Sequence, residues 1–231
     1  MPSNLHMFKS CTTVLFALSL APLWAQSNSH EKRLEEAGTV FEEVMGIAEK
    51  AIPQDLLARS QCIVIVPNLK KGAFIIGGKF GRGFFTCRKA DKVGWSAPAA
   101  IKVEGGSLGF QIGGSESDII MVVQNESGAN RLLSSKFTLG GDASVAAGPV
   151  GREAAADTDL TMKAEILTYS RSRGLFAGVS LQGATLRPDD DANHILYGHS
   201  IAPKDIINGA TPPPAKAAKL LSLLNKYSSR K

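Results

Sequence analysis

The sequence predicts an α+β fold: a strongly curved, mainly antiparallel and barrel-like sheet, with amphipathic helices in the N-terminal and C-terminal regions. Two observations support this prediction. Short apolar runs between residues 62 and 186 are separated by Gly, Pro and charged turns, which is typical of successive strands. Near both ends of the chain, apolar residues recur at intervals of three and four, which is typical of helices that pack by one face.

The size and composition indicate one main globular domain. The chain has 231 residues, of which 44% are hydrophobic and 20% are charged. A chain of this length can bury a sizeable core, and this composition excludes a disordered protein.

Residues 1–25 predict a secretory signal peptide. Lys9 precedes an apolar run over residues 11–25, and the polar sequence QSNSHEKR follows it. The run is too short for a transmembrane helix, although retention as an anchor is the alternative. We expect cleavage after Ala25 and export to the periplasm or the cell envelope.

Cleavage would leave two cysteines, Cys62 and Cys87. An even number of cysteines in an oxidising compartment is compatible with a disulfide. Both residues lie in strand-like apolar runs, so a disulfide and two buried free thiols both remain open.

The first long helix is expected over residues 28–50. Leu34, Phe41 and Val44 share one face with neighbouring alanines, while acids outnumber bases between residues 31 and 50. We therefore expect this helix to pack on the sheet and not to insert into an anionic membrane. Shorter helices are expected over residues 53–59, over residues 127–133 with Ser127 as the cap, and over residues 189–197.

Glycines interrupt the predicted strands. The string Phe-x-Ile-Gly-Gly occurs twice, at residues 74–78 and 110–114. A glycine inside a strand usually marks a bulge, a bend or a close backbone approach. We therefore expect a strongly curved sheet.

Residues 201–231 are expected to form a Pro-containing linker and a basic amphipathic helix over residues 215–227. An apolar stripe that includes Leu220 and Leu224 lies opposite a row of basic residues that includes Lys216 and Lys219. Such a helix can lie in a membrane interface, or it can dock its stripe on the domain. Both arrangements remain open.

No sequence pattern supports an enzyme. Residues 105–109 match G-x-S-x-G around Ser107, but strand-like sequence follows where a nucleophile elbow needs a helix. Ser144 is the other candidate nucleophile, and His194 or His199 could serve either serine only through contacts made by the fold. Residues 77–83 lack the spacing of a phosphate-binding loop.

Residues 189–191 and the two histidines also lack metal-ligand spacing, so we read this acidic cluster as a helix N-terminus. We expect no metal site and no cofactor.

Basic residues gather in the first two strands. Between residues 70 and 92 there are seven bases and one acid, interspersed with phenylalanines. Strand alternation places some of these bases on one face, which either attracts anionic headgroups or is an ordinary solvated surface. The candidate lipid-binding residues are Lys70, Lys71, Lys79 and Arg82, together with Lys216 and Lys219 of the last helix. We expect an anionic lipid or membrane surface as the partner, and no nucleic acid.

Small residues dominate the segment 140–151, where eight of twelve are Gly, Ala or Ser. Small side chains permit close backbone packing, and an Asp can accept backbone N–H groups in a tight turn. We interpret the segment as a structural motif made of Gly140, Gly141, Asp142, Gly148, Pro149, Gly151 and Arg152.

This segment, in the run KFTLGGDASVAAGPVGR, resembles the SYLF domain family, and so does YSRSRGLFAGVSLQGATLRPDDDAN at residues 169–193. Upstream, IVIVPNLKKGAFIIGGKFGRG and GWSAPAAIKVEGGSLGFQIGG fit the same pattern in order, so the resemblance covers about residues 48–198. It implies a compact α+β domain, here residues 26–200 with the N-terminal helix, that has no known catalytic activity. Eukaryotic members are associated with phosphoinositide-containing membranes and actin.

The sequence therefore predicts a non-enzymatic, exported protein that binds anionic, phosphoinositide-like headgroups through basic surface residues. The alternative is a structural or protein-interaction module of the periplasm that binds an envelope protein and no lipid.

Overall fold

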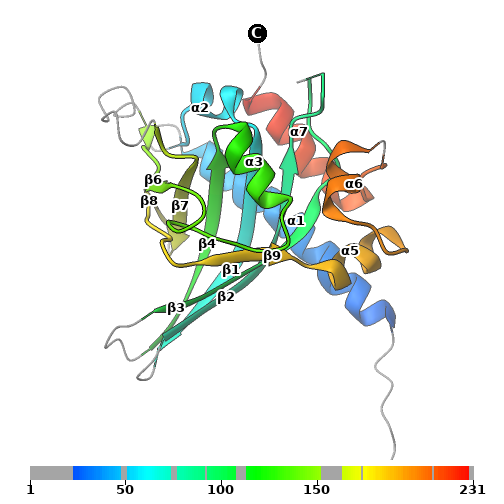
Figure 1. Ribbon diagram of the computed structural model, residues 1–231, viewed down its shortest axis with the longest axis horizontal. Coiled ribbons are helices and arrows are strands. Elements are labelled where there is room, and N and C mark those ends of the chain that lie inside the picture. The colour runs from blue at the N-terminus through cyan, green and yellow to red at the C-terminus, as the bar shows by residue number, and fades with distance from the viewer. Residues whose placement is uncertain are drawn as a thin grey trace, which may run out of the picture.

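The computed structural model describes residues 23–47, 51–73, 77–91, 93–107, 113–151, 163–172, 174–209 and 211–228. It confirms the predicted α+β class. A strongly curled half-barrel sheet forms the centre, and helices from both terminal regions pack against it (Figure 1).

The described residues form a sheet of nine strands in the order β5-β9-β3-β2-β1-β4-β7-β6, with β8 paired to β7. The four long central strands are β1 (Cys62–Ala73), β2 (Gly77–Cys87), β3 (Ala99–Ser107) and β4 (Gly113–Val123). The short flanking strands are β5 (Phe137–Thr138), β6 (Val145–Ala147), β7 (Ile166–Ser172), β8 (Leu175–Gly178) and β9 (Thr185–Pro188). Only the β6–β7 pair is parallel among these strands, so the sheet is mainly antiparallel, as predicted.

Strand β2 is continuous through its glycines. Opposite it, β1 has a bulge between Ile65 and Lys70, where Asn68 has a φ of 52°. The backbone of β1 approaches β2 so closely that a Cβ atom added at Gly83 would lie 2.1 Å from the carbonyl oxygen of Ile65. The glycines in β2 therefore provide space for the bulge, and they do not end the strand.

The helices are α1 (Leu23–Gly46), α2 (Gln54–Arg59), α3 (Glu126–Leu132), α5 (Asp190–Tyr197), α6 (Pro203–Asn208) and α7 (Ala218–Tyr227), the last preceded by the 3-10 turn η2 (Ala215–Ala217). Two expectations need correction. The cap of α3 is Asn125, whose side chain accepts the N–H of Gly128 at 2.9 Å, and not Ser127. Part of the predicted linker is helix α6, which buries Ile206 and Ile207. Within the described ranges, no helix is both long and apolar enough to cross a membrane.

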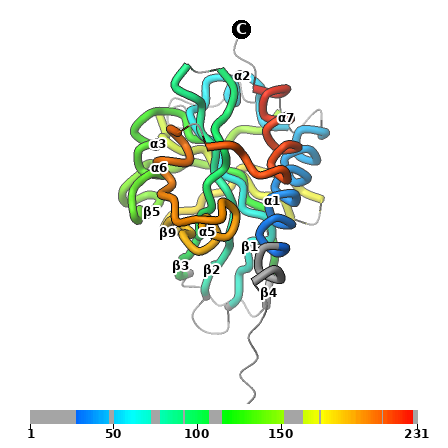
Figure 2. The backbone as a smooth tube through the Cα atoms, turned by 90° about the vertical axis from the view of Figure 1, so that its right-hand side faces the viewer, coloured from blue at the N-terminus to red at the C-terminus, as the bar shows by residue number. Residues whose placement is uncertain are grey.

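Each face of the sheet has its own core. On one face, α1 and α7 pack together against the strands, with Phe41 and Leu224 fully buried. On the opposite face, residues of α3 and α6 and Leu139, which follows β5, form a core with strand residues such as Ile119. Figure 2 shows α1 and α7 on one side of the strands and α3 and α6 on the other.

Helix α7 adopts the docked arrangement of the two that the sequence left open. Its stripe residues Leu220 and Leu224 are buried. Lysines of this segment pair with acids of α1: Lys216, in the turn η2, lies 3.1 Å from Glu35, and Lys219, in α7, lies 2.7 Å from Glu42. The acidic surface of α1 therefore meets the basic side of the C-terminal helical segment.

Cys62 and Cys87 are directly opposite each other on β1 and β2, and they are joined in a disulfide. The sequence was compatible with either a disulfide or two buried free thiols, and the structure contains the disulfide.

Candidate functional site

The four basic residues predicted in the first hairpin lie on both faces of the sheet. Lys71 is directly opposite Lys79, and Lys70 is directly opposite Phe80. Because successive residues of a strand point to opposite faces, Lys71 and Lys79 share one face, and Lys70, Phe80 and Arg82 share the other. The structure therefore separates the predicted patch into two parts.

The ends of β1 and β2 form an open projection, which we call the hairpin tip (residues 70–72 and 78–80). Figure 1 shows the ends of the four long strands projecting away from the helices. Phe80 is 47% exposed, and Cβ atoms added at Gly72 or Gly78 would meet nothing within 4 Å. Both faces of the sheet are accessible here.

Positive charge is concentrated on one face of this tip. Neither Lys71 nor Lys79 takes part in an ion pair with the described residues, whereas Lys70 lies 3.6 Å from Glu116. Partial burial and the nearby charge of Lys79 lower the pKa of Lys71. Two adjacent lysines that have no ion-pair partner among the described residues can bind an anion from outside the chain.

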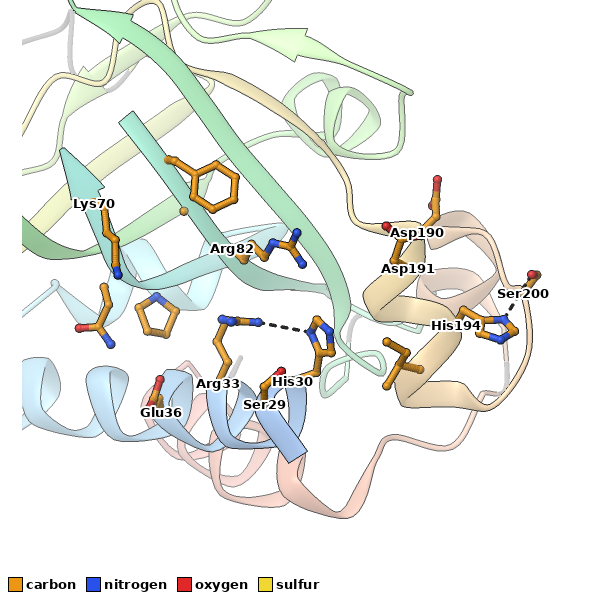
Figure 3. A pocket seen from close by; sticks show the side chains of 15 residues that line it. Ser29, His30, Arg33, Glu36, Lys70, Arg82, Asp190, Asp191, His194 and Ser200 are labelled. Carbon is orange, nitrogen blue, oxygen red and sulfur yellow. Dashed lines mark hydrogen bonds between the residues drawn. The ribbon is translucent and has the colours of Figure 1, made fainter. Parts of the chain in front are cut away.

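A second site is an open pocket of about 950 Å³ between α1, the β1–β2 hairpin and α5. Figure 3 shows its charged side chains. Helix α1 contributes His30, Arg33 and Glu36, the hairpin contributes Lys70, Phe80 and Arg82, and α5 contributes Asp190, Asp191 and His194.

A buried carboxylate connects the β1–β2 hairpin to the start of α5. Asp189 is fully buried and accepts the N–H of Ala192 at the start of α5. It lies 3.0 Å from the Lys102 ammonium and 3.4 Å from the Arg82 guanidinium. Arg82, predicted to bind lipid, is therefore paired inside the domain. Asp189 acts as a helix cap, which agrees with the helix N-terminus expected at residues 189–191.

His30 and Arg33 lie together in the wall formed by α1. His30 is 6% exposed, and its Nδ1 accepts from the Arg33 guanidinium at 3.3 Å. Burial and the charge of Arg33 lower the pKa of His30, and burial and the charge of Arg82 lower the pKa of Arg33. These two residues were not predicted as site residues, because the apolar face of the helix was the stronger signal in the sequence. The polar stripe of Ser29, Arg33 and Glu36 was the available signal.

Of the two candidate nucleophiles, only Ser144 has a described side chain, and its hydrogen bonds are to Glu165. The Ser144 hydroxyl accepts the backbone N–H of Glu165 at 2.9 Å, and the Ser144 N–H donates to the Glu165 carboxylate at 2.8 Å. Ser107 ends β3, and its side chain lies outside the described structure. His194 is paired with Ser200, and His199 with the Tyr197 carbonyl. The described side chains include no group of three His, Cys, Asp or Glu that could hold a metal ion.

The small-residue segment is tightly packed. Gly140 adopts a φ of 81°, and Asp142 accepts the N–H of Thr138 at 2.7 Å, which closes a turn. Gly148 lies against the ring of Tyr169, and its N–H donates to the Thr168 carbonyl at 3.0 Å. Pro149 is buried beside it, and Gly151 has a φ of 64° and donates to the Ala51 carbonyl. Arg152 lies outside the described residues.

Comparisons with known proteins identify the family. Residues 104–227 match the family model Ysc84, described as Las17-binding protein actin regulator. Over 183 residues, 79% of the chain, it is 35% identical to human SH3 domain-containing YSC84-like protein 1, and it covers 53% of that protein. Over 180 residues, 77% of the chain, it is 36% identical to LAS seventeen-binding protein 3 of Saccharomyces cerevisiae, of which it covers 39%.

The chain thus spans about half or less of the length of these relatives. The family description names Las17 binding and actin regulation, which supports a binding role. The SYLF resemblance is confirmed, and the chain belongs to the Ysc84 family.

Proposed function

We propose that this protein is a non-enzymatic binding protein of the cell envelope that attaches to anionic membrane surfaces through its hairpin tip. The proposal includes export directed by residues 1–25. The observation that supports it most strongly is the Lys71–Lys79 pair, which stands on projecting strand ends without a carboxylate partner among the described residues.

The expected attachment is weak and sensitive to salt. A basic residue close to an anionic leaflet contributes about 1 kcal/mol to binding, and this contribution falls off within a Debye length. Phe80 is exposed on the opposite face of the same tip, and it adds apolar contact with the interface. Lys216 and Lys219 contribute little in this account because they already pair with α1.

Neutralising the tip tests this assignment. In the Lys71→Gln/Lys79→Gln variant, we expect affinity for vesicles of phosphatidylglycerol and phosphatidylcholine to fall about thirtyfold, because two contributions of about 1 kcal/mol are lost. The salt dependence of binding should also become shallower. Co-sedimentation at low and high salt measures both effects.

The matched control is the Lys216→Gln/Lys219→Gln variant, which removes the same charge from the docked helix segment. Binding should stay close to that of the original protein, because these lysines already pair with acids of α1. The fold should also tolerate the change, since each lost ion pair is partly exposed and contributes little to stability. If both variants lose binding equally, general positive charge is responsible and the assignment to the tip is wrong.

A protein partner is the second candidate, and the descriptions of the relatives favour it. The family is described as Las17-binding, and the yeast relative carries LAS seventeen in its name. If the chain is exported, its partner would be an envelope protein. This function predicts no vesicle binding at any salt concentration and recovery of one discrete protein with the tagged chain.

A further inference from the structure

The pocket between α1, the β1–β2 hairpin and α5 is lined by charges of both signs: the bases lie on α1 and the hairpin with Glu36 among them, and two further acids lie at the start of α5. Arg33, Lys70 and Arg82 line one part, and Glu36, Asp190 and Asp191 supply an equal number of carboxylates. A ligand with several negative charges would therefore meet as much repulsion as attraction. A ligand with one group of each sign can be attracted at both ends.

The bases of this pocket have unused capacity for an anion. Arg33 is half-buried, and the hydrogen bond described for its side chain is to a histidine nitrogen and not to a carboxylate. The second guanidinium, that of Arg82, is close enough to lower the pKa of Arg33. A guanidinium group can donate two parallel hydrogen bonds to two oxygens of a phosphate or carboxylate. An anion bound between these two arginines would also reduce the repulsion between their positive charges.

The two further acids are at the start of α5. Asp190 and Asp191 are exposed, and Figure 3 shows them on the α5 side of the pocket, apart from Arg33 on α1. Asp191 lies 3.5 Å from Lys102, whereas Asp190 takes part in no ion pair with the described residues. A primary ammonium group, with three N–H donors, can satisfy carboxylates at this position.

We propose that this pocket binds a small zwitterion, with its phosphate or carboxylate group at Arg33 and Arg82 and its primary ammonium group at Asp190. The volume of about 950 Å³ is sufficient for a ligand of this size. Two sources share this chemistry: a lipid headgroup that contains ethanolamine phosphate, and a soluble amino acid or phosphorylated amine. The site is independent of the charge-driven attachment proposed for the hairpin tip.

Calorimetric titration of the full chain tests the site with three probes. These are O-phosphoethanolamine, which carries both charges, glycerol 3-phosphate, which carries only the anion, and ethanolamine, which carries only the cation. We expect O-phosphoethanolamine to bind at least tenfold more tightly than either single-charge probe. Equal affinities for the three probes, or no binding of O-phosphoethanolamine, would overturn the proposal.

Two variants assign the two ends of the ligand. Arg33→Gln should weaken O-phosphoethanolamine and glycerol 3-phosphate about tenfold, whereas Asp190→Asn should weaken only the probes that carry the ammonium group. The controls are Lys32→Gln and Glu126→Gln, which change exposed residues outside the pocket. Thermal denaturation separates binding from folding, since Arg33→Gln removes a charge that faces another guanidinium and should not lower the melting temperature. Unchanged binding in both pocket variants would reject the site.

Uncharged vesicles separate the two sources. Phosphatidylethanolamine in phosphatidylcholine should retain the protein through Arg33 if the ligand is a headgroup, and binding only of the soluble probe indicates a free zwitterion. Both results support the site. The Lys71→Gln/Lys79→Gln variant should bind O-phosphoethanolamine normally, so failure of the tip proposal and failure of the pocket proposal give different results.

Discussion

Replacing Gly148 by alanine is expected to lower the free energy of unfolding by about 3 kcal/mol, the upper part of the usual range for overpacking a core. An added Cβ would lie 2.0 Å from Cζ of Tyr169, a distance at which something must move. The tyrosine ring cannot move easily, because it is fully buried and stacks on Phe176 with ring centroids 5.5 Å apart. Urea denaturation measures the loss.

Gly141→Ala is the matched control in the same segment. Its added Cβ would have its nearest neighbours at 3.8 Å, an ordinary contact, so the change should stay within about 0.5 kcal/mol. Replacing the ring with a smaller side chain in Tyr169→Leu should make the Gly148→Ala substitution less destabilising, because the added Cβ would occupy space that the ring fills in the original protein. Equal effects of the two glycine substitutions would show that the small residues do not serve close packing.

The second large effect is expected at the base of the pocket. Lys102→Met should cost about 3 kcal/mol, because it leaves the fully buried Asp189 with the Arg82 guanidinium at 3.4 Å as its one remaining ion-pair partner among the described residues. Lys102 is itself 8% exposed, so solvent screens the pair only weakly. Chemical denaturation at neutral pH provides the measurement.

A double substitution distinguishes charge from packing at this position. Asn at position 189 keeps a capping oxygen but removes the charge, so Lys102→Met/Asp189→Asn should recover part of the loss. Lys136→Met, at an exposed lysine, should be nearly neutral. If Lys102→Met behaves like Lys136→Met, the buried ion pair is not important for stability.

The periodic parts of the fold were predictable from the sequence. The spacing of Leu34, Phe41 and Val44 indicated the buried face of α1, and the apolar runs indicated the central strands. The two-residue strand β5 and the three-residue strand β6 were not predictable, because they are too short for any alternation to be visible and depend on their pairing with β9 and β7.

The candidate site was less predictable, and the bulge in β1 shows why. Simple alternation from Ile63 and Ile65 would place Lys71 on the face covered by α1. The bulge reverses this alternation, so Lys70 lies there instead and Lys71 lies beside Lys79 on the opposite face. No periodic pattern reveals one inserted residue.

The pocket depends on contacts between distant parts of the sequence. It brings together Arg33, Arg82 and Asp190, which belong to three separate elements. Their individual positions suggested an amphipathic helix, a basic strand and a helix N-terminus. The proximity of these side chains results from the way in which α1 and α5 pack around the hairpin, and a single sequence does not contain that information in readable form.

Attachment to anionic membranes through the hairpin tip is tested most directly by measuring contact between the tip and lipid. Tryptophan fluorescence is recorded for Phe80→Trp and for the control Leu175→Trp, which changes a 72% exposed residue on β8, with vesicles of brominated phosphatidylglycerol. Attachment through the tip predicts a blue shift and strong quenching for Phe80→Trp and little change for Leu175→Trp. Equal responses of the two variants, or an unquenched Phe80→Trp protein that still sediments with the vesicles, would contradict it.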